Sequence, residues 1–102
     1  MEEKTVCPFG EVLRGARKER GLSQYRLAKM AKRSARYISM LEHNKREPKL
    51  STVLMLARVM NMDAGELVRA VDVLLPDEWA RPDEADIQPG KSGRPRKKLS
   101  AE

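Results

Sequence analysis

Two helix-start signals lie only eleven residues apart in this chain, and this short spacing constrains its fold more than any other feature. Ser23 and Ser34 each precede a segment with apolar residues at helical spacing. A serine in that position can accept a hydrogen bond from a free backbone N–H at the start of a helix. The apolar stripes consist of Leu27, Ala28 and Ala31 in the first segment and of Ile38 and Leu41 in the second. The sequence therefore predicts two short helices joined by a sharp corner.

A further helix is predicted before this pair. Pro8 suits the first turn of a helix, where its missing N–H costs nothing, and Phe9, Leu13 and Ala16 then form an apolar stripe. Gly21 is expected to end this helix, because glycine readily takes the left-handed conformation found just past a helix C-terminus.

Two more helices are predicted after the pair. Ser51 is expected to cap a helix that closes at a left-handed Asn61. Asp63 and Glu66 have the spacing of a capping box at the start of the last helix, which Pro76 ends. No strand-like alternation of useful length appears. We therefore expect an all-α fold, a compact bundle of five short helices around one core.

The composition limits the chain to one small domain. It has 102 residues, of which 40% are hydrophobic, enough for a single aliphatic core. No apolar run approaches the roughly 20 residues of a membrane span, and the charged N-terminus lacks the apolar stretch of a secretory signal, so a cytoplasmic protein is expected. Cys7 and His43 are the only cysteine and histidine, so no disulfide, metal site or cofactor is expected.

Positive charge is concentrated in one part of the chain. Residues 14–49 contain twelve Lys or Arg against three Glu, a balance of +9, whereas the whole chain carries +6. Such a cluster creates a positive field suited to a polyanion, and binding gains free energy by releasing counterions from phosphates. A merely solvated basic face is the alternative. An enzyme is not expected, because the sequence contains no paired carboxylates, no nucleophile with a base and no phosphate-binding glycine loop.

Several positions lie in the register of one known family. They are Leu13, Arg17, Gly21-Leu22-Ser23-Gln24, Leu27-Ala28, Tyr37-Ile38-Ser39, Leu41-Glu42, Pro48 and Leu54 to Ala57. Through them, residues 9–75 resemble the Cro/repressor-type helix-turn-helix family, also called Xre-like. The resemblance implies a lambda-repressor-like five-helix bundle whose third helix enters the major groove of DNA. It also implies a homodimer that binds a two-fold symmetric operator.

The sequence departs from the family pattern at the corner between the two helices. The turn position that is usually glycine is Lys32, and the next position, commonly apolar, is Arg33. A left-handed Lys32 costs about 1 kcal/mol relative to glycine. Alternatively, both cations stand where they can reach phosphate.

The helix expected from Ser34 to His43 carries the candidate base-reading residues, because a helix in the major groove presents its N-terminal residues to base edges. Arg36 is the strongest candidate, since its planar fork matches the O6 and N7 acceptors of guanine. Met40, one turn further, either touches the same surface or packs inward. The other candidates for base contacts are Ser34, Ala35 and Ser39.

A second set of residues is expected on the DNA backbone. The resemblance implies that Gln24 clamps a phosphate or supports a base contact, with a merely exposed side chain as the alternative. It also implies an ion pair in which Glu42 orients Arg17 beside the phosphates. Tyr37 either contacts the backbone or folds onto the domain. The full set is Arg17, Ser23, Gln24, Lys32, Arg33, Tyr37, Asn44, Lys45 and Arg46.

The segments outside residues 8–75 have a different composition. Residues 1–7 are expected to be flexible, and the charged segment 76–102, with its Pro and Gly, is expected to be disordered. Arg94-Pro95-Arg96 resembles the core of an AT-hook, which lies in an A·T minor groove; a non-specific electrostatic arm is the alternative. Trp79 is expected to fold back onto the domain or a dimer seam, with partner binding as the alternative.

The expected function is a sequence-specific DNA-binding transcriptional regulator, a repressor associated with the nucleoid. Dimerisation is expected through the fifth helix and the segment after it, which carry more apolar residues than one small core needs. These residues are Val68, Val71, Leu74 and Leu75. The alternative is an antitoxin-type protein that autoregulates through the same domain and covers a toxin with its C-terminal tail. No membrane partner is expected.

Overall fold

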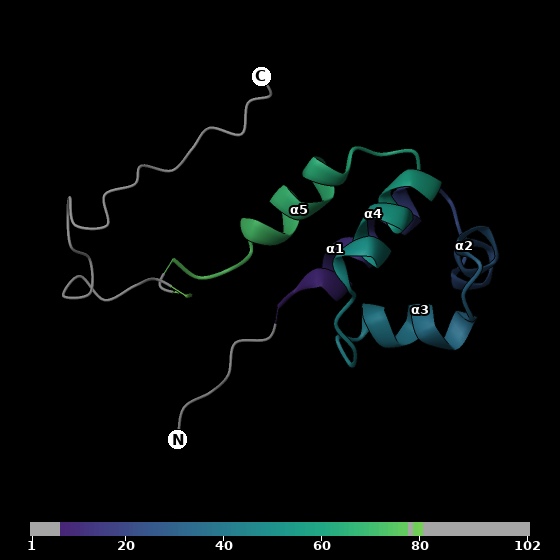
Figure 1. The fold of residues 1–102 in the computed structure, drawn as a ribbon, viewed down its shortest axis with the longest axis horizontal. Helices are drawn as coiled ribbons and strands as arrows, with labels where there is room; N and C mark the ends of the chain where they lie inside the picture. Colours follow the sequence, from purple (N-terminus) through teal and green to yellow (C-terminus); the bar gives the residue numbers. More distant parts are fainter. Residues whose placement is uncertain (1–6, 78, 81–102) are drawn as a thin grey trace.

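The computed structural model describes residues 7–77 and 79–80, which contain five helices and no strand (Figure 1). The helices are α1 (Phe9–Glu19), α2 (Gln24–Ala31), α3 (Ala35–Glu42), α4 (Leu50–Val59) and α5 (Ala64–Asp72). The predicted all-α, five-helix fold is confirmed. None of these helices is both long enough and apolar enough to cross a bilayer. The proposed AT-hook at residues 94–96 and most of the tail lie outside the described residues.

The helices close around one core. α1 packs against α3 and α5, α2 packs against α3 and α4, and α4 packs against α5, so each helix packs against at least two others. The core is aliphatic apart from one phenylalanine and one methionine. It consists of Phe9, Leu13, Ala16, Leu27, Ala28, Ala31, Ile38, Leu41, Leu56, Ala57, Met60 and Leu67.

The corner between α2 and α3 forms as the sequence predicts. Ser23 Oγ accepts a hydrogen bond from the Arg26 N–H at 2.9 Å, and Ser34 Oγ accepts one from the Tyr37 N–H at 3.0 Å. Lys32 takes the left-handed conformation between the two helices, with φ 57°. The corner therefore forms without the usual glycine, at a backbone cost of about 1 kcal/mol.

The predicted cap of α4 is wrong. α4 begins at Leu50, so Ser51 lies inside the helix, and Lys49 is the residue before it. Lys49 is extended, with ψ 160°, and its carbonyl accepts the Thr52 N–H at 2.9 Å. Leu50 and Ser51 are exposed, so water can satisfy their N–H groups and a side-chain cap is not needed.

The capping box predicted for α5 does not form either. Asp63 occupies the position before the helix, but its side chain accepts no backbone hydrogen bond there. Its carboxylate instead lies 4.0 Å from the guanidinium of Arg69, one and a half turns into the helix. At the other end, Trp79 lies beside the turn after α5, where its backbone N–H donates to the Pro76 carbonyl at 2.9 Å, and the residue stays 45% exposed.

The start of α1 is held by the loop that follows α3. Asn44 is left-handed, with φ 57°, and its Oδ1 accepts the Gly10 N–H at 2.8 Å. Its Nδ2 donates to Glu11 at 3.3 Å. A Cβ at Gly10 would overlap the carbonyl oxygen of Glu42 and lie 2.6 Å from that of Leu41. Glycine at this position therefore lets the start of α1 meet the end of α3.

Replacing Gly10 with Ala should lower the free energy of unfolding by about 1–3 kcal/mol, because the added methyl group meets backbone atoms of α3 that cannot move aside. Gly15→Ala is the matched control. It lies in the same helix with open space around it, and it should raise stability by about 0.5–1 kcal/mol. Urea denaturation measures both. Equal effects of the two substitutions would contradict the close approach at Gly10.

Candidate nucleic-acid interface

α3 has one face in the core and one face toward solvent. Ile38 and Leu41 are fully buried, and Glu42 is buried beside them. The opposite side borders a shallow hollow of about 380 Å³. The hollow is lined by Arg36, Ser39, Met40, His43 and Lys45. Three of the five predicted base-reading residues are thus brought together on one open surface.

The other two predicted base-reading residues lie at the start of α3. Ser34 is exposed, and its Oγ already accepts the cap hydrogen bond, which leaves its hydroxyl proton free to donate. Ala35 is half-buried and packs against the core. Tyr37 packs there as well, which corresponds to the alternative in which it folds onto the domain.

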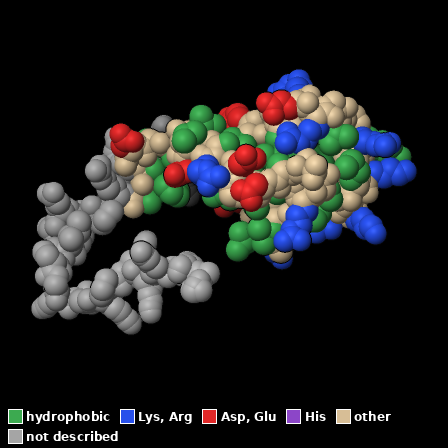
Figure 2. Space-filling model, turned by 90° about the horizontal axis from the view of Figure 1, so that it is seen from above, with side chains coloured by type: hydrophobic (Ala, Val, Ile, Leu, Met, Phe, Trp, Pro, Cys, Tyr) green, Lys and Arg blue, Asp and Glu red, His purple; other side chains and the backbone are tan. Residues whose placement is uncertain are grey.

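Exposed cations surround the outward face of α3. Lys32 and Arg33 lie at its start, and Lys45 and Arg46 follow its end. Among the described residues, ion pairs join only Arg17 to Glu42, Arg20 to Glu19 and Arg69 to Asp63, so the four flanking cations have no acidic partner there. Figure 2 shows Lys and Arg side chains over the end of the molecule that holds α2, with acidic side chains nearer α5.

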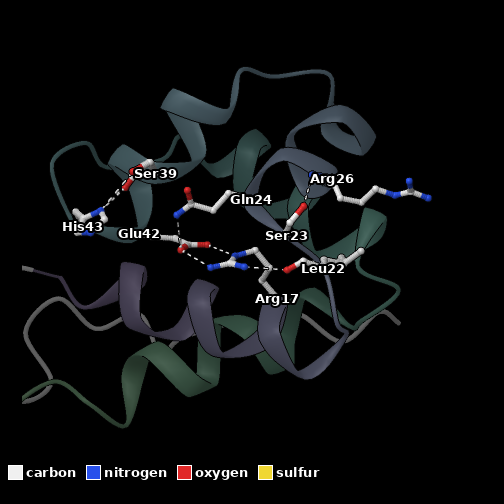
Figure 3. A network of polar contacts seen from close by, with 8 residues as sticks. All are labelled: Arg17, Leu22, Ser23, Gln24, Arg26, Ser39, Glu42 and His43. Atoms are coloured by element: carbon white, nitrogen blue, oxygen red, sulfur yellow. Dashed lines mark hydrogen bonds and ion pairs between the residues drawn. The ribbon is translucent and has the colours of Figure 1, made fainter.

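A buried ion pair joins α1 to α3 behind this face (Figure 3). Arg17 Nε donates to Glu42 Oε2 at 2.6 Å, and Arg17 Nη2 donates to Glu42 Oε1 at 3.0 Å. Arg17 Nη1 donates to the Leu22 carbonyl at 2.8 Å, and Gln24 Nε2 donates to Glu42 Oε1 at 3.0 Å. One carboxylate therefore ties α1, the start of α2 and the end of α3 together.

The environment of this pair keeps both partners charged. Burial alone would raise the pKa of the Glu42 carboxyl, but hydrogen bonds from Arg17 and Gln24 outweigh it, and the pKa is lowered. The hydrogen bond to Glu42 likewise raises the pKa of the Arg17 guanidinium against the opposing effect of burial. The only acid of α3 is thus neutralised inside the domain, and none faces outward.

Three of the residues predicted to contact the DNA backbone have side chains that are hydrogen-bonded to another part of the domain. The Arg17 side chain is 10% exposed, and each of its three nitrogens donates within the domain, so its contact with phosphate stays a prediction. Gln24 is half-buried with one N–H bound to Glu42. The amide of Asn44 is bound to α1. Ser23, Lys32, Arg33, Lys45 and Arg46 are exposed.

Two contacts at the end of α3 were not expected from the sequence. The first is the hydrogen bond from Gly10 to Asn44, described above. The second joins His43 Nδ1 to the Ser39 carbonyl oxygen at 2.9 Å. His43 follows Ser39 by four residues and Arg36 by seven, and this spacing places all three on one face of a helix. The sequence therefore contains a signal for the contact between His43 and Ser39.

The family of the chain follows from its match to a known family model. The helix-turn-helix family model matches residues 13–67, a little more than half of the chain. The chain belongs to the Cro/repressor-type helix-turn-helix family. Proteins of this family are DNA-binding regulators, which are generally not enzymes, and the chain is accordingly a DNA-binding transcriptional regulator.

Solved structures of two regulators are similar to this chain. The restriction-modification controller protein C.AhdI from Aeromonas hydrophila is 32% identical, with a TM-score of 0.58 over 61% of this chain and 90% of that chain. The clp gene regulator ClgR from Corynebacterium glutamicum matches in two structures. One is 19% identical, with a TM-score of 0.66 over 74% of this chain and 97% of that chain. The other is 20% identical, with a TM-score of 0.61 over 80% and 100%. The likeness to ClgR shows the fold alone. No curated protein matched the sequence.

Replacing Glu42 with Gln should lower the free energy of unfolding by about 3 kcal/mol, because Arg17 would remain buried without an anionic partner. The pKa of Glu42 is lower in the folded than in the unfolded protein, so the contribution of the pair is complete above the unfolded value of about 4.3 and is lost as the pH falls through the folded value. The stability difference between wild type and variant, measured by urea denaturation, should therefore shrink in acid.

Glu47→Gln is the control for this experiment, because Glu47 is exposed and makes no ion pair among the described residues. It should change stability by less than about 0.5 kcal/mol. A Glu42→Gln protein as stable as the Glu47→Gln protein at neutral pH would refute the structural role of the pair.

Proposed function

We propose that this regulator is a sequence-specific repressor that inserts α3 into the major groove of a two-fold symmetric operator. The observation that carries the proposal is the charge arrangement of α3. Its one acid is buried against Arg17, its outward side carries Arg36, and both of its ends are flanked by cations that have no ion-pair partner among the described residues. An outward face without negative charge can approach phosphates closely, and counterion release favours that approach.

Base reading is assigned first to Arg36. Its side chain is exposed at the N-terminal half of α3, where a helix in the major groove meets base edges. Its guanidinium can donate two parallel hydrogen bonds to guanine O6 and N7. The roles proposed for the neighbours are weaker hydrogen bonds or apolar contacts. These neighbours are Ser34, Ala35, Ser39 and Met40.

Affinity is assigned to the cations at the two ends of α3. Lys32 and Arg33 in the corner, and Lys45 and Arg46 in the following loop, are exposed at the two ends of α3 and are proposed to contact phosphates there. Such contacts hold the protein in register but carry no sequence information. Ser23 and Gln24 at the start of α2 are proposed to add a further phosphate contact, which the helix N-terminus favours.

A homodimer through α5 is part of the proposal. Val68 is 49% exposed and Leu74 is 54% exposed, whereas Val71 and Leu75 are half-buried. Val68 and Val71 also line an apolar groove of about 220 Å³, together with residues of α1 and α4. An apolar patch that spans α5 and the turn after it suits a two-fold dimer, and the symmetry of such a dimer would match a palindromic operator. The antitoxin alternative depends on the tail, of which the structure describes only residues 76, 77, 79 and 80.

Arg36→Ala should relax the preference at one base position of each half-site and weaken operator binding by about 1–3 kcal/mol. Arg46→Ala should instead weaken binding to all sequences and reduce the slope of log K against log salt by roughly one unit. Selection from random duplexes measures the preference, and titrations at several salt concentrations measure the slope. Unchanged base preference in Arg36→Ala would exclude Arg36 from base reading.

Val68→Asp should shift the protein from dimer to monomer, because a carboxylate would be desolvated in the proposed α5 interface. Sedimentation equilibrium without DNA measures this shift. Met30→Asp is the matched control, since Met30 is 40% exposed on α2, whose main packing partners are α3 and α4. A Val68→Asp protein that dimerises as strongly as Met30→Asp would place the dimer interface elsewhere.

A further inference from the structure

α3 ends at a histidine, His43, whose ring is held by a backbone carbonyl of the same helix. His43 Nδ1 lies 2.9 Å from the carbonyl oxygen of Ser39 and 3.5 Å from the Ser39 hydroxyl (Figure 3). A carbonyl oxygen can only accept, so the hydrogen of this bond belongs to Nδ1. In the neutral imidazole the other nitrogen, Nε2, then has no hydrogen and presents a lone pair.

His43 shares the outward side of α3 with Arg36. Both side chains are exposed, and both line the hollow that also contains Met40. Seven residues separate them, which corresponds to a rise of about 10 Å along a helix. Base pairs in a duplex are about 3.4 Å apart, so the two side chains can reach positions about three steps apart in the same groove.

We propose that His43 is a second specificity-determining residue of α3, whose Nε2 accepts a hydrogen bond from the exocyclic amino group of a cytosine or an adenine. This inference rests on the proposed function of α3. The N4 amino group of cytosine and the N6 amino group of adenine are the hydrogen-bond donors of the major groove. With guanine or thymine at that position, a hydrogen-bond acceptor would face the Nε2 lone pair and no hydrogen bond could form. Arg36 and His43 thus have opposite hydrogen-bonding roles: Arg36 donates to guanine, and His43 accepts from an amino group.

A phosphate is not a suitable partner for this nitrogen. Phosphate oxygens accept hydrogen bonds, and an Nε2 without a hydrogen cannot donate one. Lys45, which lines the same hollow, is the side chain suited to that task. In the neutral imidazole, the direction of the bond between His43 and the Ser39 carbonyl therefore separates a base-reading role from a backbone role.

Selection from random duplexes at about pH 8.5, where a free imidazole is neutral, tests the base-reading role. Wild type should select cytosine or adenine at one position of each half-site, distinct from the position altered by Arg36→Ala. His43→Phe keeps a ring without a lone pair, so it should lose that preference alone and bind the selected operator about five-fold more weakly. His43→Arg, which only donates, should change the preference there to guanine.

The outcomes separate this inference from the proposed function. If wild type selects no motif, the proposed function fails. If Arg36→Ala changes the motif while both His43 variants keep it, the inference is wrong and the proposed function stands. A His43→Phe protein with unchanged preferences but a salt slope lower by about one unit would assign His43 to a phosphate and overturn the inference.

A second measurement tests the ring itself in the free protein. Because His43 is the only histidine of the chain, labelling histidine with 15N yields a single pair of ring-nitrogen signals. Long-range proton–nitrogen correlation should show the hydrogen on Nδ1. A hydrogen on Nε2 would remove the acceptor and overturn the inference.

Discussion

The buried pair of Arg17 and Glu42 is the constraint on which the interface depends. A buried ion pair adds little net stability once desolvation is counted, but it tolerates few alternative geometries. Here it fixes the end of α3 against α1 and, through Gln24, against the start of α2. The same pair removes the only negative charge of α3 from the surface. The position of α3 and the absence of negative charge on its outward face thus both follow from one ion pair.

The proposed division of labour on the surface follows from the chemistry of the side chains. The lysine and arginine side chains at both ends of α3 are exposed and have no acidic partner in the part of the chain that the structure describes, which suits contact with the repeating phosphate backbone. Arg36 and His43 line the hollow on the outward side of α3 and present oriented donor and acceptor groups, which suits base edges. A regulator needs both kinds of contact, because charge supplies affinity while directional hydrogen bonds discriminate between sites.

The sequence predicted features that depend on local chemistry and missed those that depend on distant segments. The caps at Ser23 and Ser34 were predictable because donor and acceptor lie three residues apart. The Arg17–Glu42 pair was predictable only through family resemblance, since nothing local joins two residues 25 positions apart. Ser51 was misassigned because a helix with exposed N–H groups at its start needs no side-chain cap. The contact of Gly10 with the end of α3 depends on tertiary approach, which no spacing encodes.

The most direct test of the account is chemical-shift mapping of the full chain with a duplex obtained by selection. The largest chemical-shift changes should fall on the exposed residues of α3 and on the flanking loops. The shifts of Ile38 and Leu41 should change little, because these residues face the core. Changes centred on α4 or α5, with the outward side of α3 unaffected, would contradict the account.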